Sequence, residues 1–196
     1  DWESGELVAE SAVGMERRGA RVPAHWHHKR VTLLDYSAPH VARDAVIMAS
    51  RWGNVRHAPR LNYQRMAEQP CHDVEPRHGA MVLCSGVERS DVWGLAKWYT
   101  SKRKNGGRVL VAAKLYVFAE ERRGIDIIQS TLGHEIGHGL GLPHHPAEGA
   151  MMHPIILGIV YPSVYEERAI KRTYGGKDRW HKKGGRDGNR RHHHRK

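Results

Sequence analysis

Long apolar runs, cysteine and phenylalanine are scarce in this chain. No stretch approaches the roughly 20 consecutive apolar residues that a membrane-spanning helix needs, so we expect no transmembrane segment. The chain also opens without the apolar core of a signal peptide, and we interpret it as a mature or trimmed form. Its 196 residues are 39% hydrophobic, which is enough for one domain with a packed core.

A nucleophile with a positioned base is also missing. Ser130, Thr131 and the two cysteines stand in no pattern that would activate them, so covalent catalysis is not indicated. The cysteines, Cys71 and Cys84, are 13 positions apart and flank the apolar run 80–83. They predict either a disulfide, which suits a secreted protein, or two unrelated buried thiols, which suit the cytosol.

Acidic residues are outnumbered by basic ones, and the excess is concentrated at the end of the chain. The net charge is +11, of which residues 175–196 contribute +7 through nine Lys or Arg and two Asp. Glycines interrupt this segment and Trp180 is its only large apolar side chain, so it cannot bury enough surface to fold alone. Residues 176–196 are either a solvated tail or an arm for an anionic partner, such as a wall polymer, a phospholipid headgroup or nucleic acid.

One segment is highly specific. The order H-E-x-x-H-x-x-G-x-x-H is formed by His134, Glu135, His138, Gly141 and His144. His134 and His138 project from one face of a helix, one turn apart, and imidazoles at that spacing bind a single zinc ion. Glu135 is placed to accept a proton from a water at an open position of the metal. Gly141 lets the chain leave the helix with a positive φ, and His144 then supplies the third ligand.

The adjacent His145 is the alternative third ligand. His144 stands three residues after Gly141, as the motif requires, whereas binding by His145 would require one extra residue to be accommodated between Gly141 and the metal. Pro143 restricts the backbone between Gly141 and the histidines and makes it unfavourable to accommodate that extra residue. The spacing therefore favours His144.

The residues after the histidines decide between a metal site and a chance match. A bare H-E-x-x-H also occurs in helices whose histidines are solvated or packed in a core. Met152 lies eight residues beyond His144 and is followed by His153 and Pro154; alone it would be an ordinary core methionine. Together with the histidines, this segment resembles the metzincin clan of zinc endopeptidases, in which a turn carries a methionine beneath the metal, and its M-x-P form is most similar to the matrixin branch.

The resemblance implies a secreted zinc endopeptidase with one catalytic zinc ion and Glu135 as its base. It implies that an extended polypeptide substrate pairs with an edge strand at Gly94, Leu95 and Ala96. The alternative is an ordinary edge strand that binds no substrate and is protected from aggregation by Lys97. A peptidase is safer exported, which favours a disulfide between the two cysteines. We also expect a monomer.

Downstream of Met152, the chain has its most apolar stretch, residues 154–161. The resemblance implies that this segment, through Pro154, Ile155 and Ile156, forms the wall of the pocket for the residue just after the cleaved bond, which favours an apolar side chain there. Matrixins also hold a structural zinc and calcium ions in aspartate-rich loops. Those aspartates are missing around His78, so these further metals are not inferred.

The remaining pattern predicts a strand, a helix, four strands, the site helix and a last helix. The strand candidates are 30–36, 61–66, 80–84, 94–100 and 108–118, with a turn at 104–107. The first helix follows Ser37 and ends near Gly53; the second has Asp126 as N-cap with Gln129 completing a capping box; the last opens at Ser163 and Glu166 and stops at Gly175. We therefore predict an α+β, metzincin-like domain at 26–175, with a twisted five-stranded mixed sheet, three main helices and an active-site cleft, between an N-terminal segment, 1–25, and the tail.

Two functions from other classes remain open. A binding module could use zinc to hold its fold, but structural sites usually have four protein ligands and no cysteine is close in sequence to supply the fourth. A protein that binds nucleic acid or anionic surfaces through its tail could carry an incidental metal site. The other histidines lack ligand spacing and are interpreted as solvated; they are His25, His27, His28, His57, His72 and His78.

Overall fold

The structure is a computed structural model that describes residues 7–12, 25–86, 93–102, 108–118 and 125–175. The predicted turn at 104–107 and the basic tail, 176–196, lie outside these residues. Within these residues, six strands form one sheet in the order β1-β5-β6-β4-β2-β3. Their bounds are β1 (Leu7–Ala12), β2 (Arg30–Asp35), β3 (Arg60–Arg65), β4 (Ala80–Ser85), β5 (Gly94–Lys102) and β6 (Arg108–Val117).

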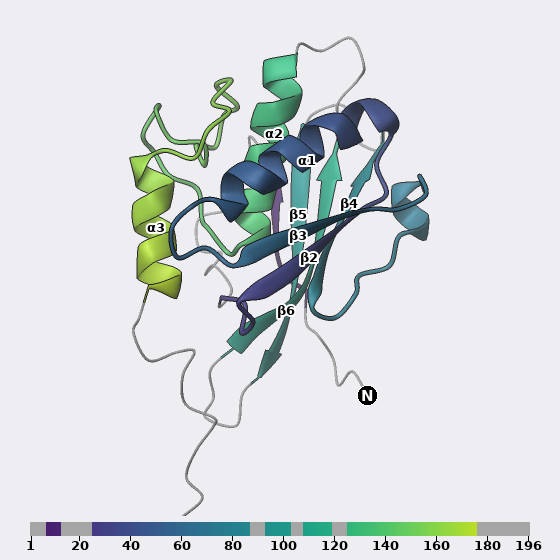
Figure 1. Cartoon of the computed structure of the whole chain (residues 1–196), viewed down its shortest axis with the longest axis horizontal. Coiled ribbons are helices and arrows are strands. Elements are labelled where there is room, and N and C mark those ends of the chain that lie inside the picture. Colours follow the sequence, from purple (N-terminus) through teal and green to yellow (C-terminus); the bar gives the residue numbers. More distant parts are fainter. Residues whose placement is uncertain (1–6, 13–24, 87–92, 103–107, 119–124, 176–196) are drawn as a thin grey trace, which may run out of the picture.

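The five predicted strands are all present, and their pairing makes the sheet mixed. Strands β3, β2, β4 and β6 run parallel to one another, and β5 runs antiparallel to β6. In the described part of the chain, three helices accompany the sheet, α1 (Pro39–Gly53), α2 (Ile125–Gly139) and α3 (Val164–Tyr174) (Figure 1), together with the short 3-10 helix η1 (Cys71–Asp73). The predicted α+β architecture is confirmed.

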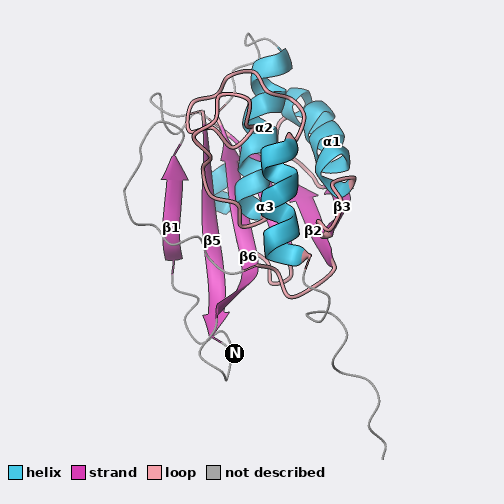
Figure 2. Cartoon of the chain, turned by 90° about the vertical axis from the view of Figure 1, so that its left-hand side faces the viewer, coloured by secondary structure: helices cyan, strands magenta, loops and turns pink. Residues whose placement is uncertain are grey.

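The sixth strand, β1, was not predicted. It comes from the N-terminal segment that the sequence placed outside the domain, and it pairs antiparallel with β5, from Leu7 opposite Tyr99 to Ala12 opposite Leu95. Figure 2 shows β1 beside β5 at one side of the sheet. Strand β5 is therefore not the edge strand that the sequence predicted, because the chain itself covers that edge.

The sheet separates two apolar clusters, because successive side chains of a strand point to opposite faces. Leu33, Met81 and Leu115 lie in the larger cluster, beneath α1 and α2, which cover one face of the sheet in Figure 2. Leu34 and Val82 belong to a smaller cluster. The main core thus holds α2 against the strands.

The smaller cluster contains the disulfide. Cys71 in η1 and Cys84 in β4 are bonded, with their Cα atoms 5.3 Å apart, as the sequence favoured. Both cysteines are buried, with exposed fractions of 3% and 0%. The bridge therefore fixes η1 to the sheet. Among the described residues no helix is long and apolar enough to cross a membrane.

The helix boundaries follow their capping residues. Helix α3 opens with a complete capping box, in which Ser163 is the N-cap and Glu166 its partner in the first turn, as predicted, and it ends before Gly175. Helix α1 begins with Pro39 in its first turn. The prediction of Asp126 as N-cap of α2 is wrong, since this residue lies inside the helix, which begins at Ile125. Its supposed partner, Gln129, instead donates to the Asp44 carboxylate at 2.9 Å.

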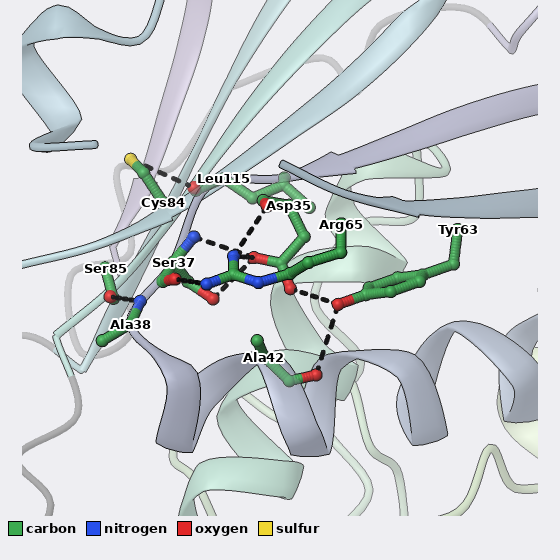
Figure 3. Close-up of polar contacts among 9 residues, drawn as sticks. All are labelled: Asp35, Ser37, Ala38, Ala42, Tyr63, Arg65, Cys84, Ser85 and Leu115. Atoms are coloured by element: carbon green, nitrogen blue, oxygen red, sulfur yellow. Dashed lines mark hydrogen bonds and ion pairs between the residues drawn. The ribbon is translucent and has the colours of Figure 1, made fainter. Parts of the chain in front are cut away.

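A buried carboxylate joins the ends of β2 and β3 to the start of α1. Asp35 accepts hydrogen bonds from Tyr63 Oη at 2.6 Å and from the hydroxyl of Ser37 at 2.6 Å, as Figure 3 shows. Arg65 lies 3.5 Å from the same carboxylate and donates to the backbone carbonyl of Ser37 at 2.6 Å. Burial and the neighbouring Asp35 raise the pKa of Tyr63 well above its ordinary value. This network orients α1 against the sheet.

Candidate active site

Helix α2 places two imidazoles in the core, one turn apart. His134 and His138 have exposed fractions of 0% and 1%. His134 donates Nδ1–H to the carbonyl of Met151 at 3.0 Å, and His138 donates Nδ1–H to the carbonyl of Leu142 at 2.8 Å. A carbonyl only accepts, so both protons are fixed on Nδ1. The Nε2 atoms of both rings are therefore left with lone pairs for a metal.

The chain reverses after α2 and returns His144 to these rings. Gly141 has a φ of 83°, as the sequence predicted. The N–H of Leu142 donates to the carbonyl of Gly137 at 3.0 Å, and that of Gly141 to the carbonyl of His138 at 2.6 Å, which is the Schellman arrangement. Nε2 of His144 consequently lies 3.2 Å from Nε2 of His134 and 3.1 Å from Nε2 of His138.

These three nitrogens fit a zinc ion. His134 and His138 each present an unprotonated Nε2 to the Nε2 of His144. Ligands at about 2.0–2.1 Å in tetrahedral geometry stand about 3.3 Å apart, close to the separations found here. His134, His138 and His144 also form the group of possible metal ligands among the described residues, with ligand atoms all within 4.8 Å of one another.

Burial keeps the two helix imidazoles neutral. Desolvation lowers the pKa of His134 to about 3, and the backbone hydrogen bond from its ring to Met151 offsets this only in part. The pKa of His138 is also well below its usual range, because the ring is buried and lies beside two other histidines. A neutral imidazole is the form that binds a metal. Both ligands are therefore ready for a cation without first losing a proton.

Glu135 is the buried acid of the site. Its side chain is fully buried, and neither carboxylate oxygen has a hydrogen-bond partner among the described residues. Desolvation raises the pKa of this carboxyl well above its usual value. A carboxylate whose oxygens make no bonds within the protein has them available for a water or an amine, and its raised pKa makes it a stronger base.

The methionine turn lies against the site helix, and Met152 is 1% exposed. A side chain at Gly137 would overlap the Met152 sulfur, so the two residues are in close contact. Glu166 accepts a hydrogen bond from the N–H of Met152 at 3.1 Å and thereby joins the turn to the capping box of α3. The N–H of His145 donates to the carbonyl of Met152 at 2.8 Å, which fixes the ligand segment to the same turn.

Three tryptophans support α2 in a way that the sequence analysis missed. Indole N–H groups of Trp52, Trp98 and Trp26 donate to the carbonyls of residues 133, 138 and 139, at 2.8, 2.7 and 2.7 Å respectively. The carbonyls of residues 138 and 139 are among the last four of α2, which lack partners within the helix, whereas that of Gly133 lies inside the helix. The available signal was the number of tryptophans, six, which is high for a chain with a single phenylalanine.

The predicted substrate residues lie in two places. Gly94 touches the Glu135 side chain, while Leu95 and Ala96 pair with Ala12 and Ser11 of β1. Of the residues beyond the methionine turn, Ile155 is 60% exposed, whereas Pro154 and Ile156 are half-buried.

Arg51 of α1 holds the end of the apolar segment 154–161, which follows the methionine turn. Its guanidinium donates to the carbonyl of Val160 at 2.7 Å and to Gln129 at 2.9 Å. It also lies over the Tyr161 ring, 4.0 Å from the ring centroid. This contact ties the segment after the methionine turn to α1 and α2.

No other histidine of the described residues joins the group of His134, His138 and His144. His145 packs on Tyr165, with ring centroids 4.5 Å apart, and its Nδ1 accepts a hydrogen bond from the N–H of Ala147. The solvated histidines of the sequence analysis are not members of the metal-ligand group. Within the described part of the chain, the structure therefore brings together the three histidines that the motif selected.

One family was found by comparison with known proteins. The family model of the matrixins matches residues 40–172, more than half of the chain. Among curated proteins, no sequence matches. Solved structures with a related chain path include myroilysin, at 14% identity and a TM-score of 0.47 over 82% of this chain and 87% of that one. Metalloproteinase-II from Bacteroides fragilis matches at 12% identity and a TM-score of 0.43, over 78% and 55% of the two chains.

Proposed function

The chain belongs to the matrixin family, and from this we propose that it is a zinc-dependent endopeptidase that hydrolyses peptide bonds of extended polypeptides. The observation that supports this most strongly is the meeting of three Nε2 atoms, from His134, His138 and His144. The next residue after His134 in α2 is Glu135, a buried carboxyl with no hydrogen-bond partner among the described residues. A purely structural zinc site would have four protein ligands. Only three are present among the described residues, which leaves a position for chemistry.

The three histidines would hold the zinc ion, which when bound supplies a Lewis acid that polarises the scissile carbonyl and makes a water more acidic. Glu135 accepts the proton of the attacking water as its oxygen bonds to the carbonyl carbon. Glu135 then delivers that proton to the amide nitrogen as the carbon–nitrogen bond breaks. Its burial excludes bulk water, so the proton is transferred within the site.

The proposed substrate edge is the backbone of β5 at Gly94, Leu95 and Ala96. An extended peptide would add to this strand by main-chain hydrogen bonds, as peptides do at sheet edges. Strand β1 now makes such pairs with Leu95 and Ala96. A substrate that uses this edge must therefore replace β1, and the N-terminal strand competes with it.

The apolar segment beyond Met152 would set the preference for the residue after the cleaved bond. Pro154, Ile155 and Ile156 have no charge to pair with a polar substrate side chain, and Ile155 is largely exposed. Burying an apolar substrate side chain against them is favourable, at about 25 cal/mol per Å² of apolar surface removed from water.

We further propose that the protein is exported and works as a monomer. A disulfide between Cys71 and Cys84 is stable in oxidising compartments and rare in reducing ones. Binding of anionic surfaces by the tail remains a separate proposal, because residues 176–196 lie outside the described part of the chain.

The test is the variant Glu135→Ala in the zinc-loaded full chain. We expect zinc content and folding to be retained and peptide cleavage to fall by about 100- to 10,000-fold, the usual contribution of general acid–base catalysis. Glu167→Ala, an exposed carboxylate on α3, is the matched control and should keep full activity. Appreciable turnover by Glu135→Ala, with zinc measured in the same sample, would exclude Glu135 as the base.

A further inference from the structure

Strand β5 comes unusually close to the side chain of Glu135. A Cβ atom placed on Gly94 would lie 2.7 Å from both Cγ and Cδ of Glu135 and closer still to one carboxylate oxygen. Carbon atoms in van der Waals contact are about 3.5–4.0 Å apart. The carboxylate therefore occupies the space that any side chain at position 94 would fill.

The glycine is not needed for its backbone conformation. Gly79, Gly141 and Gly158 are the glycines of the described chain with positive φ, and Gly94 is not among them. The requirement at position 94 is therefore for space and not for backbone freedom.

Strand β5 and helix α2 are held in place, so neither can easily move to make room for a side chain at position 94. The indole of Trp98, further along β5, donates to the carbonyl of His138 in α2 at 2.7 Å. Gly94 itself pairs with Val117 of β6, and the N–H of Phe118 donates to the carbonyl of Trp93 at 2.9 Å. The start of β5 is thus held both to the site helix and to its neighbouring strand. A larger residue at position 94 would displace the Glu135 side chain in preference to the strand.

Nothing else in the described structure fixes that carboxylate. Its two oxygens have no hydrogen-bond partner there, so packing alone sets its position. From this geometry we propose that Gly94 is a positioning residue for Glu135: the missing Cβ leaves the space that the carboxylate occupies. The proposal rests on the proposed role of Glu135 as the base.

The experiment compares Gly94→Ala with Gly53→Ala in the zinc-loaded full chain. Gly53 is the matched control, because a Cβ there would have no neighbour closer than 3.9 Å. For a short peptide that ends before the β5 edge, we expect Gly94→Ala to keep zinc and KM while kcat falls by about 100-fold, the effect of a displacement of about 1 Å in a catalytic group. Gly53→Ala should keep all three.

A second measurement separates positioning from a general loss of folding, and it does not need activity. Introduced into the wild type, Gly94→Ala should lower Tm. Introduced into Glu135→Ala, in which the clashing side chain is gone, the same substitution should leave Tm unchanged. This comparison of Tm values can be made even if the wild type cleaves no peptide. That outcome would refute the proposed function but not the positioning of Glu135 by Gly94. The positioning proposal is overturned if Gly94→Ala keeps kcat, loses zinc, or lowers Tm equally in both backgrounds.

Discussion

His145 lies with its ring tilted by 32° over the ring of Tyr165, 4.5 Å between centroids. Its neighbour in sequence points the other way, and His144 reaches both helix histidines with its Nε2. The carbonyl of Met152 holds the N–H of His145, so the backbone between the two histidines is fixed. Two adjacent residues of one type are thereby given different surroundings: His144 lies with the two helix histidines, and His145 packs against α3.

This arrangement predicts different results for the two alanine variants. His144→Ala removes one of three proposed ligands and should sharply lower zinc affinity and peptidase activity, because the remaining pair cannot complete the site. His145→Ala should bind zinc like the wild type and lose only the contact with Tyr165. Zinc content after dialysis against a weak chelator distinguishes them. Loss of the metal from His145→Ala alone would mean that the ligand register is wrong.

The disulfide is expected to stabilise the fold without affecting the metal site. Replacing both Cys71 and Cys84 by alanine should lower the free energy of unfolding by about 2–4 kcal/mol, because the bridge restricts the unfolded chain. Zinc content should not change, since the bridge lies in the smaller cluster and not among the ligands. Urea denaturation measures the loss. Wild-type protein treated with a reductant is the control and should be destabilised equally; no loss in either would contradict the bridge.

Removal of β1 should open the edge of β5 to substrate. Deletion of residues 1–12 is expected to lower KM for long peptides. If β1 is paired with β5 in nine-tenths of the molecules, the decrease is about 10-fold, because apparent affinity scales with the fraction of molecules whose β5 edge is open. Deletion of residues 1–6 is the control, because it leaves β1 in place. A synthetic peptide of residues 7–12 should raise KM of the shorter protein again. Equal KM values for the two deletions would show that substrate does not use this edge.

The buried phenol of Tyr174 predicts a loss of stability at high pH. Desolvation raises the pKa of Tyr174 well above its usual value of 10.0, and its hydroxyl donates to the carbonyl of Leu140 at 2.7 Å. Above pH 10 the unfolded state loses the phenol proton while the folded state keeps it, so the free energy of unfolding falls as the pH rises. Below pH 10 this contribution is fully present.

Tyr174→Phe should therefore show a shallower decline of stability between pH 9 and pH 11, measured by urea denaturation. At pH 8 it should be less stable than the wild type by about 1–3 kcal/mol, because the buried Leu140 carbonyl and the Trp26 N–H both lose the hydroxyl as a partner. Tyr161→Phe, at a side chain that is 62% exposed, is the control and should decline as the wild type does. A Tyr174→Phe curve parallel to that of the wild type would show that the buried phenol does not titrate on unfolding.

Much of the fold was predictable because it is encoded over short distances. The α1 helix follows from Pro39 and a stripe of apolar residues, and α3 from the Ser163 and Glu166 box. Where the local signal was ambiguous, the prediction was wrong, as with Asp126, because any acidic residue near a helix start resembles an N-cap. The tryptophan contacts and the Asp35 network join distant segments, and no periodicity reports them.

The sequence by itself predicted which three histidines meet. Two histidines four residues apart on a helix, a glycine with positive φ and a third histidine at fixed offset need only local geometry to converge. Tertiary structure alone decided what surrounds them: the pairing of β1 with β5, the contact of Gly94 with Glu135 and the separation of His144 from His145. These depend on which distant surfaces meet when apolar area is buried, and many sequences satisfy that requirement in different ways. Local spacing therefore predicted the chemistry, and long-range packing set how the base and the substrate edge are presented.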